Sequence, residues 1–322
     1  MGTTSHGFFT YLRLKTLAVL FRLAAGIALF RRRLANARYK GKQRLQIPSR
    51  DAGRYIPAEL YLPPSEEATK SKLPVLINWH GSGFVLPDLG SDTAYCAHIA
   101  RSTGIAVVDA DYRKAPENPF PAALHDVEDV IRWVVGQPER FDSSRIALSG
   151  FSAGGNLALV AASSSLKQRL SLPVEVAIQA VVAFYPPTDL SIAPEAKISP
   201  NPRRPIPALM ARFFDACYIP EGVSNKDPRI SPSYADKDAF PQTVVIITCD
   251  GDTLAPEADA LAAKLDDGRR RVVHRQMKGV GHAFDKTREE GSPERKLRDE
   301  SYALVDEVLR EVLKVSVPDD RQ

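Results

Sequence analysis

Gly150-Phe151-Ser152-Ala153-Gly154 is the stretch that decides the fold of this chain. The largely apolar residues 145–149 before it predict a strand, and residues 155–160 after it predict a helix. A Gly-x-Ser-x-Gly sequence between a strand and a helix is typical of a nucleophile elbow, a turn so tight that it needs glycine on both sides. Such a turn would raise the Ser152 hydroxyl above the sheet, and the helix would point its N-terminal amides toward it.

Two further regions carry the groups that an activated serine needs. An apolar strand over 73–79 runs into the glycine-rich turn His80-Gly81-Ser82-Gly83-Phe84, whose amides predict an oxyanion hole. The predicted strand 243–249 ends at Asp250 and Asp252, and the predicted strand 271–277 is followed by His282. The order Ser, Asp, His along the chain is the order of a hydrolase triad on this kind of sheet. From the residues alone, Asp250 and Asp252 compete for the role of the acid.

Five motifs in this order resemble those of the hormone-sensitive lipase family of α/β-hydrolases. They are residues 80–83, residues 111–117 with 120–123, the elbow with Gly155 and Asn156, residues 252–254, and residues 281–284. The resemblance covers roughly residues 45 to 315. It implies an α/β-hydrolase fold, with a mostly parallel central sheet, helices on both faces and a helical cap.

The resemblance also implies the site. It places the nucleophile on Ser152, the acid on Asp252 and the base on His282, with oxyanion amides on Ser82, Gly83 and Ala153. Asp252 is preferred to Asp250 because the family's acid directly precedes a Pro/Thr-Leu pair. No cofactor and no metal are needed for this chemistry.

Two positions depart from the family pattern. Ser82 replaces a glycine of the oxyanion turn, which predicts either a narrower acyl pocket or a strained backbone. Phe151 stands where many relatives carry an acidic residue, so the field beside Ser152 should be less negative. Phe84, Phe213, Phe214 and Tyr218 are candidates for the substrate pocket, although aromatic residues are as often part of the core.

Other polar residues are expected to have structural roles. We expect His80 to hold the glycine-rich loop rather than to transfer protons. Asp111, Arg113 and Glu117 are expected to brace the loop around the site. His98, His125 and His274 lie on predicted helices or a strand and are not expected to be catalytic.

The length of 322 residues, with 44% hydrophobic and 25% charged residues, predicts one sizeable core with an added lid. Strands are predicted at 104–109, 145–149, 177–184, 243–249 and 271–277, and the clearest helix at 120–136. The proline-rich region after residue 190 breaks this alternation. We therefore divide the chain into N-terminal cap helices (1–45), a core (46–190 and 226–322) and a cap insertion (191–225).

The N-terminus carries most of the positive charge. Residues 1–50 hold 11 Lys or Arg and no Asp or Glu, so the net charge of +4 combines +11 there with −7 elsewhere. The apolar stretch 17–30 contains Arg22 and is too short for a membrane span, and no signal-peptide cleavage pattern follows it. An amphipathic helix is predicted, and three uses stay open for it: a cap over the active site, a membrane-surface anchor and an organelle-targeting segment.

The predicted function is a serine hydrolase that cleaves carboxylic esters, or acetyl esters and amides, of small to medium apolar substrates through an acyl-serine intermediate. Acyl transfer, lactonisation or cyclisation by the same triad is the alternative, followed by a non-catalytic ligand-binding relative. Nucleic acid is not an expected partner, whereas peripheral membrane contact and a homodimer are open. Cys96, Cys217 and Cys249 form no metal or disulfide pattern, which favours a reducing, cytoplasmic location, with peripheral membrane attachment left open.

Overall fold

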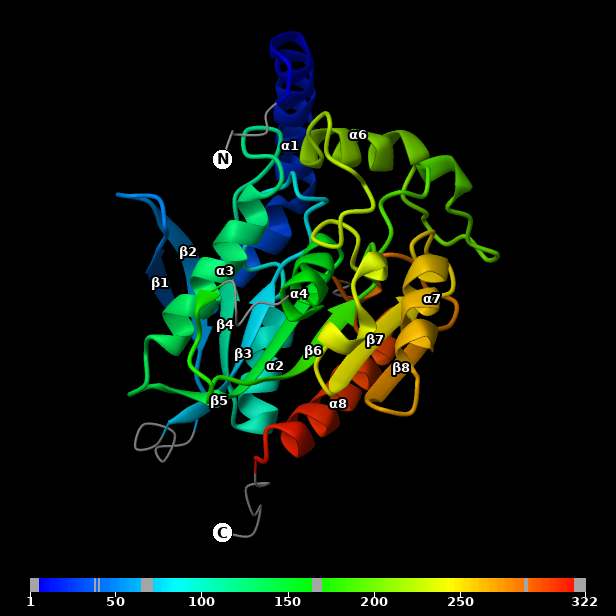
Figure 1. Ribbon diagram of the computed structural model, residues 1–322. Coiled ribbons are helices and arrows are strands. Elements are labelled where there is room, and N and C mark those ends of the chain that lie inside the picture. The colour runs from blue at the N-terminus through cyan, green and yellow to red at the C-terminus, as the bar shows by residue number, and fades with distance from the viewer. Residues whose placement is uncertain are drawn as a thin grey trace.

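The computed structural model describes residues 6–37, 39, 41–64, 72–163, 170–286 and 289–315. They form one eight-stranded sheet and the helices around it (Figure 1). Its strands, in the order in which they lie side by side, are β1 (Gln43–Pro48), β2 (Tyr55–Tyr61), β4 (Ala106–Ala110), β3 (Leu73–Trp79), β5 (Phe141–Phe151), β6 (Ile178–Phe184), β7 (Thr243–Cys249) and β8 (Arg271–Met277). Only the pairs β1–β2 and β2–β4 are antiparallel. The other neighbours are parallel, so the loops that follow these strands meet at one end of the sheet.

Both faces of the sheet are buried, which explains why its central strands are apolar runs rather than alternating patterns. In β7 all seven residues are buried. Val244 and Ile246 belong to the core on one face, and Val245 and Ile247 belong to the core on the other. A strand whose side chains point alternately to two cores is therefore mainly apolar.

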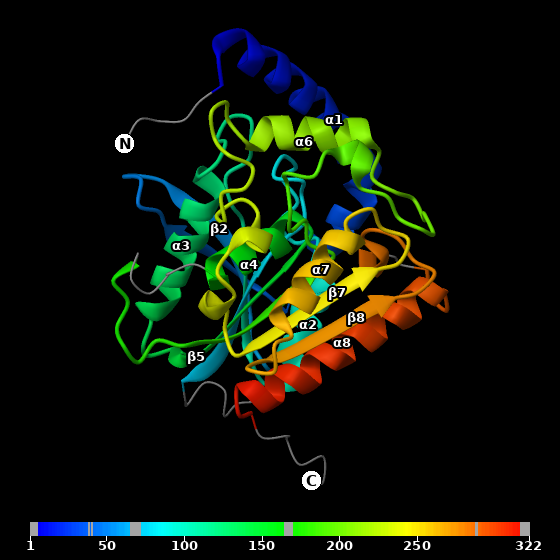
Figure 2. The ribbon, with the colours of Figure 1, turned by 45° about the vertical axis from the view of Figure 1, so that its right-hand side comes forward.

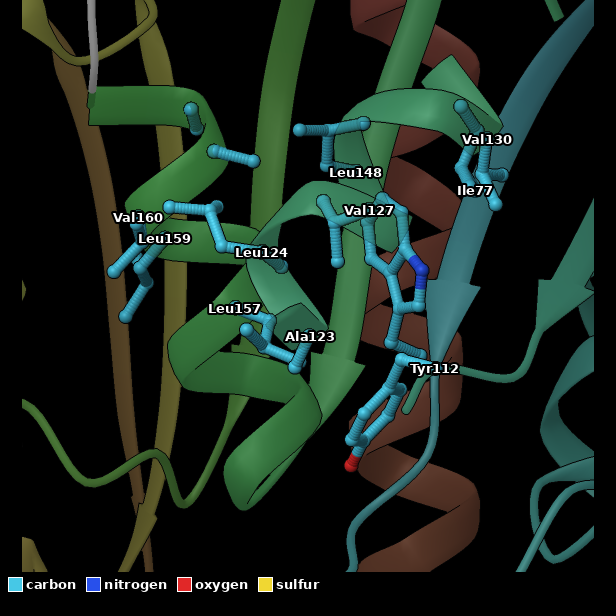
Figure 3. Packing of buried hydrophobic residues seen from close by; sticks show 14 of the residues in the cluster. Ile77, Tyr112, Ala123, Leu124, Val127, Val130, Leu148, Leu157, Leu159 and Val160 are labelled. Carbon is cyan, nitrogen blue, oxygen red and sulfur yellow. The ribbon is translucent and has the colours of Figure 1, made fainter. Parts of the chain in front are cut away.

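Helices cover the two faces. One core is closed by α3 (Ala122–Val135), α4 (Ala153–Ser163) and α7 (Ala255–Leu265), and the other by α2 (Thr93–Thr103) and α8 (Pro293–Val312). In α3, Leu124, Val127 and Val130 recur at helical spacing and point into the first core, where they meet Leu157 of α4 and Leu148 of β5 (Figure 3). The sequence-derived expectation of a mostly parallel sheet with helices on both faces is confirmed.

Two helices lie beyond the sheet. The 30-residue helix α1 (Phe8–Ala37) and the helix α6 (Ala208–Tyr218) contact each other at the end of the sheet where the parallel strands finish (Figure 2). They fall within the segments 1–45 and 191–225 that were expected to form the cap. No helix within the described ranges is both long and apolar enough to cross a membrane.

Several element boundaries differ from the sequence-derived ones. The strand expected at 104–109 is β4, Ala106–Ala110, because the left-handed Gly104 ends helix α2 just before it. The strand expected at 145–149 begins earlier, at Phe141, because Leu73 of β3 pairs with Phe141. The helix expected at 120–136 is shorter, since α3 begins after Pro121. Short 3-10 helices occur at Pro194–Ala196, Pro232–Tyr234, Lys237–Ala239 and Phe284–Lys286.

Candidate active site

The turn around Ser152 is built by close backbone contact. Strand β5 ends at Phe151, helix α4 begins at Ala153, and Ser152 between them has a positive φ of 51°. A Cβ added at Gly154 would lie 1.9 Å from the carbonyl oxygen of Trp79, and one added at Gly150 would lie 2.3 Å from the backbone of Gly154. Glycine is therefore required at both positions, and the strained serine is presented at the carboxyl end of β5.

A hydrogen-bonded chain joins three side chains from three loops. His282 Nε2 lies 2.9 Å from Ser152 Oγ, and His282 Nδ1 lies 2.7 Å from Asp252 Oδ2. Asp252 has no exposed surface and also accepts a hydrogen bond from the amide of Leu254. With the Nδ1 proton donated to this carboxylate, Nε2 carries the lone pair that accepts the serine proton.

Asp250, the competing acid, occupies a different place. Its Oδ1 accepts a hydrogen bond of 2.7 Å from the amide of Gly279, in the loop after β8. This hydrogen bond connects that loop to the end of β7. Among the residues that the structure describes, Asp252 supplies the only carboxylate bonded to the His282 ring.

Ser82, Gly83 and Ala153 line the same cavity as Ser152. The backbone N–H groups of Ser82, Gly83 and Ala153 donate to no other residue within the described part of the chain. Ala153 is the first residue of α4, so its amide also lies at the positive end of the helix dipole. Free amides from two different loops are what a developing oxyanion requires.

Ser82 causes no backbone strain, contrary to one of the two expectations for this replacement. The left-handed residues of the loop are Gly83 (φ 56°) and Phe84 (φ 61°), and Ser82 is not among them. Its hydroxyl lies 2.6 Å from the Tyr112 hydroxyl, which in turn donates to the carbonyl of His80. The extra side chain thus takes part in holding the loop.

The loop is braced from behind. His80 is fully buried, and its Nε2 lies 3.0 Å from Asp111 Oδ1, so its role is structural as expected. Although burial opposes it, the Lys114 ammonium and the His80 ring hold the pKa of Asp111 far below its usual range. Arg113 pairs with Asp126 of α3.

The three histidines that were not expected to be catalytic lie on helices or a strand, as the sequence predicted. His98 on α2 bonds to Asp306, His274 on β8 bonds to Asp259, and His125 lies on α3. Burial and nearby arginine cations lower the pKa of His125.

A largely buried cation, Lys286, contacts the elbow and also lines the cavity, which the sequence did not reveal. Lys286 Nζ lies 3.6 Å from the centroid of the Phe151 ring and pairs with Asp92 at 2.8 Å and Asp285 at 2.7 Å. Burial opposes ionisation, but the two carboxylates raise the pKa of Lys286. The residue before Ser152 thus contacts a cation through the face of its aromatic ring.

Tyr185 was also missed. It follows β6, has a positive φ of 39°, and its ring packs against that of His282 with centroids 4.7 Å apart. Its hydroxyl donates to Asp285. The rule that site residues follow the carboxyl ends of parallel strands could have found it.

A cavity of about 290 Å³ opens over Ser152 and His282 and is lined mainly by apolar side chains. From α1, the loops and α6 these include Phe21, Phe84, Leu190, Ile206, Met210, Phe214 and Leu254. Phe84 and Phe214 had been expected here. Phe213 and Tyr218 support the wall from outside the cavity: Tyr218 stacks on Phe84 with centroids 3.7 Å apart, and Phe213 packs against Phe21.

Two carboxyl-bearing residues, Asp88 and Asp215, line this mainly apolar space. Asp215 of α6 lines the cavity, and within the described part of the chain its side chain has no hydrogen bond or ion pair. Burial raises the pKa of Asp215 to about 6, against a smaller opposing influence of Lys197. Lys197 itself pairs with Glu257 at 2.6 Å.

With this geometry in view, comparisons with known proteins identify the family. A family model described as alpha/beta hydrolase fold matches residues 76–286. Ethyl acetate hydrolase of Pseudomonas putida is 32% identical over 246 residues, which is 74% of each chain. Carboxylesterase NlhH of Mycobacterium tuberculosis is 37% identical over 158 residues, covering 46% of this chain and 48% of the relative.

Solved structures support the same family assignment. The Pyrobaculum calidifontis esterase superposes with a TM-score of 0.74 at 27% identity and covers 94% of both chains. A thermostable carboxylesterase cloned from a metagenomic library gives a TM-score of 0.76 at 26% identity, covering 92% of this chain and 97% of that one. The chain belongs to the α/β-hydrolase family. Within it, the chain groups with the carboxylesterases that resemble hormone-sensitive lipase, as the sequence motifs indicated.

Proposed function

We propose that this chain is a serine carboxylesterase in which Ser152 is the nucleophile, His282 the general base and Asp252 the acid that orients it. The observation that carries the proposal is the chain of hydrogen bonds from Asp252 through His282 to Ser152, at 2.7 and 2.9 Å, at the floor of an apolar cavity. The relatives named as ethyl acetate hydrolase and carboxylesterase support the same reaction.

In the first half of the reaction, Ser152 Oγ attacks the ester carbonyl while His282 Nε2 takes its proton. The amides of Ser82, Gly83 and Ala153 stabilise the oxyanion, and Asp252 stabilises the imidazolium. His282 then protonates the leaving alcohol, and an acyl group remains on Ser152. In the second half, His282 activates water, which releases the acid and restores the serine.

The cavity favours small, uncharged acyl groups. Its volume of about 290 Å³ lies near the lower end of ligand sites, which run from about 300 to 1,000 Å³. Its lining is mainly apolar, so acyl chains would bind by burial of hydrocarbon surface. The position of α1 and α6 over this cavity supports their proposed role as the cap.

Location and partners complete the proposal. We place the enzyme in the cytoplasm, because Cys96, Cys217 and Cys249 are all buried and unpaired. We also propose that it contacts membranes peripherally through α1. A homodimer through the same helix is the competing arrangement.

Hydrolysis of p-nitrophenyl esters from acetate to decanoate tests the reaction, with labelling by a fluorophosphonate probe as an independent readout. We expect turnover to peak at short chains and labelling to occur on Ser152. Ser152→Ala should remove labelling and lower kcat/KM by at least about 10⁴-fold, with an unchanged melting temperature. A wild type that takes the probe but hydrolyses no ester would point to acyl transfer. A folded wild type that does neither would contradict the proposal.

A further inference from the structure

Helix α1 has two opposite faces with different surroundings. Its inner face is attached to the body: Leu14 and Ala18 are fully buried, and Phe21 packs edge-on against Phe214 of α6. Arg22 donates to the carbonyl oxygens of Val85 and Ala115. These contacts fix which side of the helix faces outward.

The outer face is a stripe of exposed large apolar side chains. Two adjacent rows run along the helix at spacings of four, seven or eleven residues, which repeat at nearly the same angle. They consist of Phe8, Leu12, Val19, Leu23 and Phe30, and of Phe9, Leu20, Ile27 and Leu34. Exposed fractions reach 83% at Phe9 and 81% at Ile27. A continuous apolar patch of this kind on one helix marks a binding surface.

We propose that this outer stripe of α1 docks onto the surface of an anionic lipid bilayer. The inference deepens the peripheral membrane contact given under the proposed function and rests on it. Its geometry is that of a helix lying in the plane of the interface, with its apolar face among the acyl chains.

The positive charge of the N-terminal segment favours lipid, rather than a second copy of the chain, as the binding partner of the stripe. The sequence of α1 holds six Lys or Arg and no Asp or Glu, and Arg22 among them pairs with Glu117, so two α1 helices brought face to face would repel each other. Anionic headgroups would instead attract the segment and screen its charge. The basic residue Arg13 lies exposed at the margin of the stripe, where headgroups would meet it.

Docking would also place the substrate cavity beside the bilayer. Phe21 lines the cavity, while Leu20 and Leu23, within one turn of it, point to solvent. One side of α1 therefore forms a wall of the substrate site and the other side would contact lipid.

The test is flotation of the full chain with vesicles. We compare phosphatidylcholine vesicles with mixed phosphatidylcholine and phosphatidylglycerol vesicles, at low and high salt. The expected result is flotation with the anionic vesicles that weakens with salt. The variant Leu20→Ser/Leu23→Ser/Ile27→Ser, which keeps the charge, should lower the floated fraction by at least about tenfold.

Val174→Ser is the matched control. Val174 is 93% exposed and lies before β6, at the end of the sheet opposite α1, so this variant should float like the wild type. Hydrolysis of p-nitrophenyl acetate in the absence of lipid, measured on each sample, should be unchanged in both variants. If the wild type did not hydrolyse this ester, the proposed esterase function would be contradicted, whatever the flotation result.

Three outcomes would overturn the lipid proposal. The wild type could stay in the soluble fraction with anionic vesicles, or the triple serine variant could float as well as the wild type. Light scattering could instead show a wild-type dimer that the triple serine variant converts to a monomer, without flotation of either. That last result would assign the stripe to a second copy of the chain.

Discussion

The hydroxyl groups of Ser82 and Tyr112 lie 2.6 Å apart, and Tyr112 also donates to the carbonyl oxygen of His80. One phenol thus joins two points of the loop that supplies the proposed oxyanion amides. Tyr112 is nearly fully buried, and its ring stacks against that of His80 with centroids 4.9 Å apart. The side chain that Ser82 adds to a glycine-rich turn is held in a fixed position by this contact.

Removal of the phenol should therefore disturb the oxyanion loop. Tyr112→Phe leaves the buried Ser82 hydroxyl without its partner, at a cost of about 1–3 kcal/mol. We expect kcat to fall by about tenfold or more while KM changes little, because loop position matters most in the transition state.

A double-mutant cycle checks this prediction. Ser82→Gly keeps the backbone amide and removes the hydroxyl that needs a partner, so the pair Ser82→Gly/Tyr112→Phe should lose less activity than the two single effects added together. Strictly additive losses would show that the two hydroxyls act independently.

The two neighbouring aspartates offer a matched test of the proposed acid. Asp252→Asn should favour the wrong tautomer of His282 and lower kcat by about 10⁴-fold. Asp250→Asn should stay within about tenfold of the wild type, because the Asp250 carboxylate accepts from the amide of Gly279, whereas the His282 ring bonds Asp252. The measurement is ester hydrolysis by both variants, with circular dichroism to verify folding. Equal losses of kcat in the two variants would contradict the assignment of Asp252, rather than Asp250, as the acid.

Arg22 should control the position of α1 on the body. Its guanidinium makes two hydrogen bonds to Glu117 and one each to the carbonyls of Val85 and Ala115. Arg22→Gln should raise KM by about tenfold, because Phe21 would no longer be held in the cavity wall. The ion pair is partly exposed, so we expect only about 1 kcal/mol of lost stability.

Steady-state kinetics and thermal melting measure these two effects. Arg13→Gln removes a cation from the exposed side of the same helix and serves as the control, with unchanged kinetics expected. If Arg22→Gln lowered kcat alone and left KM unchanged, α1 would have no part in substrate binding.

Asp215 should make stability fall as the pH rises. Its pKa is raised to about 6 in the folded protein, so between pH of about 4 and 6 the folded form keeps a proton that the unfolded chain releases. The stabilisation is complete at the acidic end of this range and is lost as the pH passes 6. Because the side chain is only partly removed from water, we expect about 1–2 kcal/mol.

Urea unfolding at several pH values tests this expectation. The relevant quantity is the difference in free energy of unfolding between the wild type and Asp215→Asn, since other carboxylates titrate in both proteins alike. This difference should shift in favour of the Asn variant between pH 4 and pH 6. A difference that does not depend on pH would contradict the raised pKa.

The features that the sequence predicted are those determined by residues close together along the chain. Gly150 and Gly154 are glycines because the backbone of the elbow permits nothing larger, and β7 is apolar because both its faces are buried. Such constraints are visible in a short window of sequence. The placement of Ser152, Asp252 and His282 followed because each is preceded by a recognisable strand.

The residues that were missed depend on contacts between distant segments. Lys286 contacts Phe151 of the elbow and pairs with Asp92, which lies 194 positions away along the chain, and a short window of sequence does not show that contact. Asp215 and Met210 reach the cavity only because α6 crosses it, and the aromatic residues of that helix could not be divided into lining and supporting ones without its orientation. The packing of α6 against α1 decides that division.

The floor and the cap of this enzyme are attached to the protein by different kinds of contact. At the elbow, Gly154 meets the main chain of Trp79 so closely that no side chain can intervene, whereas α1 is held largely by single side chains such as Arg22 and Phe21. An engineer who wants a new acyl preference can therefore randomise the inner surfaces of α1 and α6 and keep residues 150–155 fixed.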